Sequence, residues 1–295
     1  MAAYRILDTW GDFVRFWAAS HPLPVSEQVE RWRTEYMARY PELLRKQVDD
    51  YASQGMDWRA LATEKVFPHL PERLPLMQEA RDNLLRICGP IHGRALETLG
   101  LDLEVTFVIY VGIGCGAGWA TRYEGAPACL LGLENIAEEG WHTTVRLRGL
   151  VAHELGHLAH MAWRGEWEEF ATHERDPLFL LYSEGFAMRC EEAILGAAGH
   201  LVQDEEWSAW CEAHRATLAA EFLRRLDAGQ GVCDFFGSWR EVQGHGQTGY
   251  FLGRAFIRDL ERGQTLRDVA RVPATGVRAL ARRFLAHTAR DASSA

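Results

Sequence analysis

Two histidines and a glutamate in the spacing H-E-x-x-H are the residues of this chain best suited to chemistry. They are His153, Glu154 and His157. On a helix, two imidazoles four residues apart lie on one face, where each can offer a nitrogen to the same zinc ion. The carboxylate between them is placed to take a proton from a water molecule on that ion. The spacing therefore predicts a zinc site that activates water.

A zinc ion that catalyses hydrolysis has three protein ligands and keeps one position for water. The motif supplies two ligands, so another part of the chain must supply the third. His160 is on the same face, but it lies seven residues from His153, which is about 10 Å along a helix axis. Because zinc bonds its ligands at about 2 Å, His160 cannot join His153 and His157 around one ion. We expect His160 to support the ligands or to line the substrate site.

Glu184 is the predicted third ligand. It lies on the apolar face of a predicted helix whose first residues, Asp176 and Pro177, are typical of a helix N-terminus. A carboxylate on such a face is costly to bury unless a cation or a hydrogen-bond donor meets it. A zinc ion would meet that need. The alternative is an ion pair with an arginine such as Arg189 or Arg146.

A small sheet is expected to precede the motif helix. Residues 103–111 are β-branched and aromatic, which predicts a strand, and the glycine cluster 112–118 predicts the turn that ends it. A second strand is expected over residues 128–134. Apolar residues at helical spacing predict helices from residue 4 to about 98, and most of the chain after Thr143 is also predicted to be helical.

The expected fold class is therefore α+β, mostly helical, with the small sheet before the motif helix. Residues 1–100 would form an N-terminal helical region. Residues 101–295 would contain the metal site and the C-terminal helices. At a length of 295 residues, we expect the two regions to form one compact unit.

The motif and the segment around Glu184 resemble the gluzincin metallopeptidases. In that group, which includes thermolysin and aminopeptidase N, the third zinc ligand is a glutamate in an N-E-G or N-E-A context on the next helix. Here Ser183 stands where asparagine is usual, and 26 residues separate His157 from Glu184, more than in thermolysin. The span from about 105 to 260 is also similar to bacterial proteins known only as predicted zinc-dependent proteases. The resemblance implies a zincin-like fold.

The resemblance also implies roles for two further segments. Residues 132–135, Gly-Leu-Glu-Asn, precede the motif helix where such enzymes place the strand that pairs with substrate, and they are similar to the Gly-Ala-Met-Glu-Asn string of aminopeptidases. An ordinary edge strand and turn is the alternative. Gluzincins also use a downstream tyrosine or histidine to donate a hydrogen bond to the oxyanion. Tyr250 is the first choice for this role and His245 the second, against the alternative that Tyr250 belongs to the core.

The expected function is that of a zinc metallopeptidase acting on a peptide or protein, with Glu154 as general base. A carboxylate that orients the histidine ligands is also expected, and Glu191 is the candidate. The alternative function is a non-catalytic, zinc-stabilised module that binds another protein on the same scaffold. The presence of Glu154 argues against this alternative, because a structural zinc site has four protein ligands and no use for a base.

The composition excludes other classes of function. Lys and Arg number 32 against 41 Asp and Glu, so the formal net charge is −9. Nucleic acids and anionic membranes both need a basic surface, so neither is an expected partner. The N-terminus has no secretory signal pattern, and no apolar run approaches the roughly 18 residues of a membrane span. The six cysteines contain no C-x-x-C pair, which favours reduced thiols and a cytoplasmic location.

Overall fold

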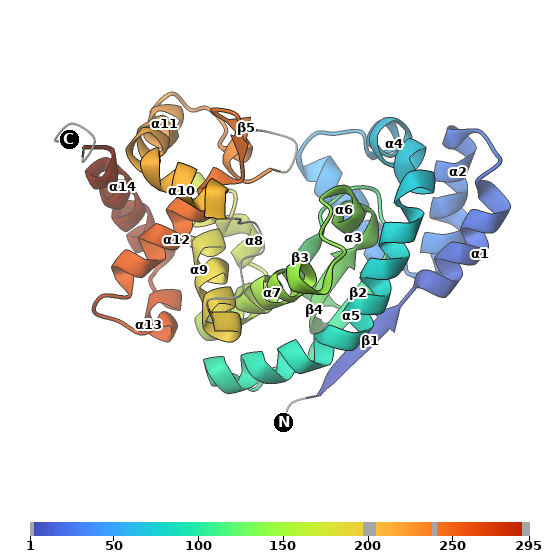
Figure 1. The fold of residues 1–295 in the computed structure, drawn as a ribbon, viewed down its shortest axis with the longest axis horizontal. Helices are drawn as coiled ribbons and strands as arrows, with labels where there is room; N and C mark the ends of the chain where they lie inside the picture. The colour runs from blue at the N-terminus through green and yellow to red at the C-terminus, as the bar shows by residue number, and fades with distance from the viewer. Residues whose placement is uncertain (1–2, 197–204, 238–240, 291–295) are drawn as a thin grey trace. The chain divides into compact units, whose positions relative to one another are not determined.

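The computed structural model describes residues 3–196, 205–237 and 241–290, and Figure 1 shows its elements in chain order. Helices dominate, and a small mixed sheet lies in the N-terminal half, which confirms the expected mostly helical α+β class. Contacts divide the chain into two compact units, residues 1–154 and 155–295. The boundary falls inside helix α7 (Thr144–Arg164), the helix that carries the H-E-x-x-H motif.

The first unit contains a four-stranded sheet with the spatial order β1-β2-β4-β3. Its first three members are parallel, and β3 pairs antiparallel with β4 at the edge. The interior strands are the most apolar, since every residue of β2 is buried. The strands are β1 (Tyr4–Asp8), β2 (Val105–Tyr110), β3 (Gly118–Tyr123) and β4 (Ala126–Gly132).

The two strands predicted from sequence are confirmed as β2 and β4, with slightly different ends. Two other strands contradict the predictions. Residues 4–8 were expected to be helical, but they form β1, which pairs with β2 across about a hundred residues of chain. Gly118 was expected in a turn, but it begins β3, which pairs with β4 over its full length.

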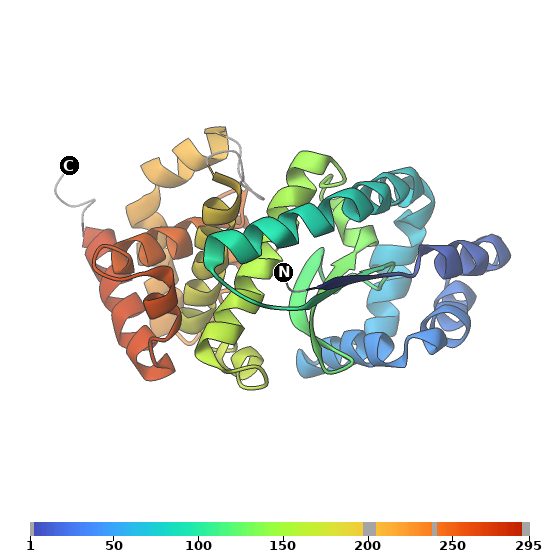
Figure 2. The same ribbon diagram turned by 90° about the horizontal axis from the view of Figure 1, so that it is seen from below.

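Helices make up the rest of the first unit. The longest, α5 (Leu70–Leu99), contacts β1 and β2 and runs across the sheet (Figure 2). Pro75 and Pro90 lie inside α5. The other helices are α1 (Trp10–Ser20), α2 (Val25–Arg31), α3 (Pro41–Ser53), α4 (Trp58–Leu61) and α6 (Leu133–Glu138), with short π and 3-10 segments at Trp32–Arg39 and Ala62–His69.

The second unit is built around α9 (Pro177–Leu195), which packs against α12 (Thr248–Leu260) and α14 (Ala274–Arg290). Asp176 caps α9 by accepting a hydrogen bond from the backbone N–H of Leu178 at 2.9 Å, as predicted. A Cβ atom on Gly185 would overlap the backbone of Gly253, so α9 and α12 can approach this closely only because both residues are glycine.

The remaining elements of the second unit are short. They are α8 (Phe170–His173), α10 (Glu205–Ala213), α11 (Arg215–Asp227), a 3-10 turn (Cys233–Phe235), the hairpin strands β5 (Glu241–Val242) and β6 (His245–Gly246), and α13 (Leu266–Ala270). Within the described ranges of both units, no helix is long and apolar enough to cross a membrane.

Candidate metal centre

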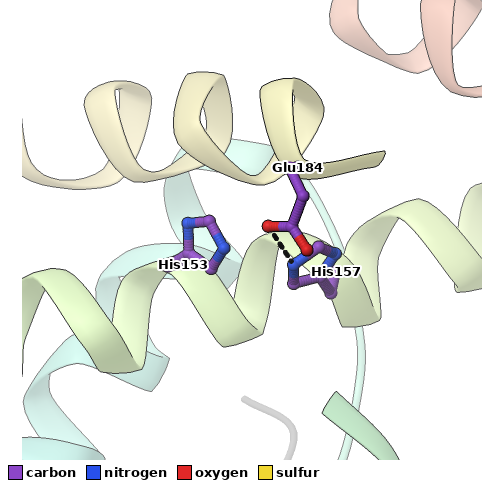
Figure 3. Close-up of side chains that lie close together, drawn as sticks. All are labelled: His153, His157 and Glu184. Atoms are coloured by element: carbon purple, nitrogen blue, oxygen red, sulfur yellow. Dashed lines mark ion pairs between the residues drawn. The ribbon is translucent and has the colours of Figure 1, made fainter. Parts of the chain in front are cut away.

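The three predicted metal ligands lie close together. His153 and His157 project from α7, and Glu184 projects toward them from α9 (Figure 3). Each side chain offers one ligand atom, and these atoms all lie within 4.8 Å of one another. The two histidines are 3% and 8% exposed, so the imidazoles are largely shielded from water. Two imidazole nitrogens and one carboxylate oxygen form a donor set that suits zinc.

The spacing between His157 and Glu184 fits a shared metal ion. Nε2 of His157 lies 3.4 Å from Oε2 of Glu184. Two ligand atoms of a tetrahedral zinc ion, each bonded at about 2.0–2.1 Å, are about 3.3 Å apart. Arg189, the arginine alternative for Glu184, pairs instead with Glu192 and Glu261. The Arg189 ion pair therefore does not explain the position of Glu184.

Small residues allow α7 and α9 to bring these side chains together. A Cβ atom on Gly156 would lie 2.8 Å from Cβ of Cys190 and 3.0 Å from Cα of Ala187. Real side chains almost never approach that closely, so a larger residue at position 156 would push the helices apart. The glycine inside the motif thus sets the distance between Glu184 and the motif helix.

A hydrogen-bonded chain fixes the ring of His157. The hydroxyl of Ser183 donates to Oε1 of Glu174 at 2.5 Å. That hydroxyl has one proton, so it must accept at its 3.3 Å contact with Nδ1 of His157. Nδ1 then carries the hydrogen, and Nε2, which faces Glu184, keeps its lone pair for a metal. Ser183 thus has a defined role at the position where the gluzincin pattern has asparagine.

Glu174 and Ser183 were not expected to support the ligands. Burial raises the pKa of Glu174 to about 7, against the opposing effect of nearby His157. Glu191 was the predicted supporting carboxylate. It is completely buried, and its charge opposes the lowering of the Arg254 pKa that burial causes. The role of Glu191 stays a prediction, while Ser183 and Glu174 support His157.

Glu154, the predicted general base, is 6% exposed and lies beside strand β3. A Cβ atom on Gly118, the first residue of β3, would overlap Oε1 of Glu154. The missing side chain at this position therefore provides the space that the carboxylate occupies. No sequence pattern singled out Gly118, although it belongs to the glycine cluster that follows β2.

Residues 132–135 do not form an edge strand that could pair with a substrate. Gly132 ends β4, which lies between β2 and β3, and residues 133–138 form α6. Glu134 turns inward and accepts hydrogen bonds from the backbone N–H groups of Gly112 at 2.7 Å and Gly114 at 3.1 Å. Burial raises the pKa of Glu134 to about 7, although these donors oppose the shift. Its role is to hold the glycine-rich loop that leads into β3.

His160 belongs to an aromatic cluster, whereas it was expected to support the ligands or to line the substrate site. It is completely buried, and its ring stacks on Phe186 at a centroid distance of 4.1 Å. Phe170 and Tyr182 meet the ring edge to face. Within the part of the chain that the structure describes, neither ring nitrogen has a hydrogen-bond partner. Burial lowers the pKa of His160 well below its usual value, with a further contribution from Arg164, so the imidazole is neutral.

Replacing His160 with phenylalanine should stabilise the protein. The aromatic stacking remains, while two buried nitrogens without partners are removed, so we expect a gain of about 1–3 kcal/mol. The wild type should also lose stability as the pH falls below about 6.5, because the unfolded chain then binds a proton that the folded chain excludes. Thermal unfolding at several pH values should show that His160→Phe loses less stability at low pH than the wild type does. An exposed control, His69→Phe, should show neither effect, and a destabilised His160→Phe would contradict the prediction.

The two candidate oxyanion donors lie near the start of α12. Tyr250 is in its first turn and meets Phe236 edge to face. His245 lies in β6 and stacks on Trp210 at a centroid distance of 3.6 Å. Both side chains are half-buried. Neither is one of the three residues that could hold the metal, and the oxyanion role of both stays a prediction.

Comparison with known proteins adds no relative. No family model matches the chain, and searches of curated proteins and of solved structures find no match either.

Proposed function

We propose that this chain is a zinc metallopeptidase of the gluzincin type, with a zincin-like fold. The observation that supports this proposal most strongly is the convergence of His153, His157 and Glu184, whose ligand atoms lie within 4.8 Å of one another. The general base of the motif, Glu154, is on the same helix as the two histidines. This combination is what hydrolysis of a peptide bond by activated water requires.

The ligands His153, His157 and Glu184 would hold the ion. When bound, zinc acts as a Lewis acid that polarises a carbonyl group and lowers the pKa of water. The Ser183 hydroxyl and the Glu174 carboxylate keep the hydrogen of His157 on Nδ1, which leaves Nε2 free to bind. This second layer of hydrogen bonds is typical of metal sites, where it fixes the tautomer of the ligand.

Glu154 performs the proton transfers in this proposal. Its carboxylate takes a proton from the attacking water and then delivers it to the nitrogen of the leaving amine. The substrate peptide pairs with β3, whose outer edge has no strand beside it among the described residues. Because Gly118 begins β3 and touches Glu154, a peptide on this edge passes the general base. Tyr250 or His245 donates a hydrogen bond to the developing oxyanion.

We also propose a cytoplasmic location and a peptide or protein substrate. All six cysteines are free thiols in the structure, and four of them are completely buried small apolar groups without a metal-ligand arrangement: Cys88, Cys129, Cys190 and Cys211. This pattern suits a reducing compartment. The alternative function, a zinc-stabilised binding module, would require the zinc but would never cut its partner.

A digest of a diverse peptide library by the purified protein tests this proposal. The wild type should carry about one zinc ion per chain and cut a subset of the peptides. Removal of zinc by a chelator should abolish cleavage, and added zinc should restore it, since the ion is needed to activate water. Stoichiometric zinc with no cleavage of any peptide would favour the binding module over the peptidase.

A further inference from the structure

Two charged side chains of helix α3 contact strand β3 and the turn that follows it. Oε2 of Glu42, in the first turn of α3, accepts a hydrogen bond from the backbone N–H of Glu124 at 3.0 Å. Lys46, one helical turn further on, donates to Oγ1 of Thr121 at 3.2 Å. Its ammonium nitrogen also lies 5.8 Å from the centre of the Trp119 ring. Lys46 therefore brings a positive charge to the middle of this edge strand.

The two faces of β3 meet different groups. Trp119 and Thr121 are two residues apart in the strand, so they lie on the same face, which is the face that Lys46 contacts. Gly118 lies on the opposite face, where a Cβ atom would overlap Oε1 of Glu154. The general base and Lys46 are thus placed on opposite faces of the same strand.

The position of Lys46 favours recognition of a negative charge. The Thr121 hydroxyl and the Trp119 ring are both neutral, so these two contacts place the ammonium group without cancelling its charge. The side chain is half-buried, and a charge in that position interacts more strongly with a neighbouring charge than one in bulk water does. Lysine is also scarce in this chain, which has only Lys46 and Lys65.

A peptide that pairs with the outer edge of β3 would bring some of its side chains to Lys46. Its side chains would alternate between the two faces of the extended sheet. Side chains directly opposite each other on paired strands have Cβ atoms about 4.5–5.5 Å apart. A substrate side chain opposite Thr121 is therefore within reach of the ammonium group, which lies 3.2 Å from the Thr121 hydroxyl.

The distance along β3 places this contact relative to the scissile bond. Trp119 and Thr121 are one and three residues from Gly118, which corresponds to about 3 and 10 Å along the strand. The peptide passes Glu154 at Gly118. The substrate residues that face Lys46 are therefore one to three residues from the bond that is cut.

We propose that Lys46 selects substrates with an aspartate or glutamate one to three residues from the scissile bond, on one side of it. This inference rests on the proposed peptidase function and on pairing of the substrate with β3. The ammonium group would donate a charged hydrogen bond to the substrate carboxylate. Substrate residues next to the selected one point to the other face of the sheet, so the acidic preference should not extend to them.

Cleavage-site profiles of the peptide library, followed by kcat/KM for two peptides that differ only by Asp or Asn at the selected position, test this proposal. The wild type should prefer the Asp peptide about tenfold at low ionic strength, because the Asn peptide lacks the charged hydrogen bond. Lys46→Gln should lose this preference, Lys46→Arg should keep it, and Lys46→Glu should prefer a peptide with Lys at that position. Lys65→Gln, a change at an exposed position, should keep the wild-type ratio.

The ratio compares two peptides on the same enzyme, so it does not depend on how much of a variant is folded. Added salt should reduce the preference of the wild type, since it screens a half-buried lysine, and should leave the ratio for Lys46→Gln unchanged. Cleavage without an acidic preference, or with a preference that persists in Lys46→Gln, overturns the role of Lys46 and leaves the peptidase function standing. A wild type that cuts no peptide overturns both.

Discussion

Glu154→Gln should lower the rate of peptide hydrolysis at least about 100-fold while zinc content and thermal stability stay close to those of the wild type. Glutamine has nearly the same shape as glutamate, so it fits the space beside Gly118 that the carboxylate fills. It cannot accept a proton from water, however, and the transfers assigned to Glu154 would fail. The affinity for zinc should be retained because Glu154 is not one of the three proposed metal ligands, which are His153, His157 and Glu184.

Hydrolysis of one fluorogenic peptide, followed with zinc analysis of the same samples, measures this effect. Glu168→Gln is a suitable control, since it changes the charge equally at an exposed position. This control should cut the peptide at the wild-type rate. If Glu154→Gln is as active as the wild type, Glu154 is not the general base, and the peptidase mechanism proposed for this chain is wrong.

The parts of the fold that could be predicted are those whose pattern is local. The run of β-branched and aromatic residues in β2 is buried throughout and marks a strand in any context. Strand β1 has no such run, and its residues form a strand because they pair with β2, about a hundred positions away. Strand β3 begins with glycine and depends in the same way on β4. A local sequence pattern does not predict a strand that forms because it pairs with a segment distant in sequence.

The residues of the candidate site also differ in whether a local pattern or long-range packing brings them together. His153, Glu154 and His157 share one helix, so their spacing alone places them together. Glu184 was found because a carboxylate on an apolar helix face needs a partner. Ser183 and Glu174 were missed because their contact with His157 depends on how α8, α9 and the loop between them pack. Glu134 was misread because its position before the motif helix suggested a substrate strand, whereas its carboxylate binds the backbone of the glycine loop.

Removing a ligand should have the second large effect: His157→Ala and Glu184→Ala should each lose zinc during dialysis and lose hydrolysis with it. The reason is that each substitution leaves two protein ligands, and a stable zinc site with open coordination normally has three. Glu174→Gln should retain zinc but bind it about 10–100-fold more weakly, because it disturbs only the hydrogen bond that orients His157 through Ser183.

Zinc titration against a chelating dye separates these outcomes on the purified variants. A graded result, with no binding in Glu184→Ala and reduced binding in Glu174→Gln, identifies Glu184 as the ligand and Glu174 as its support. The opposite order would reverse the two roles, since Glu174 also lies close enough to His157 for their charges to interact. In that case the 3.4 Å contact between His157 and Glu184 is a simple ion pair, and the third ligand comes from the segment before α9.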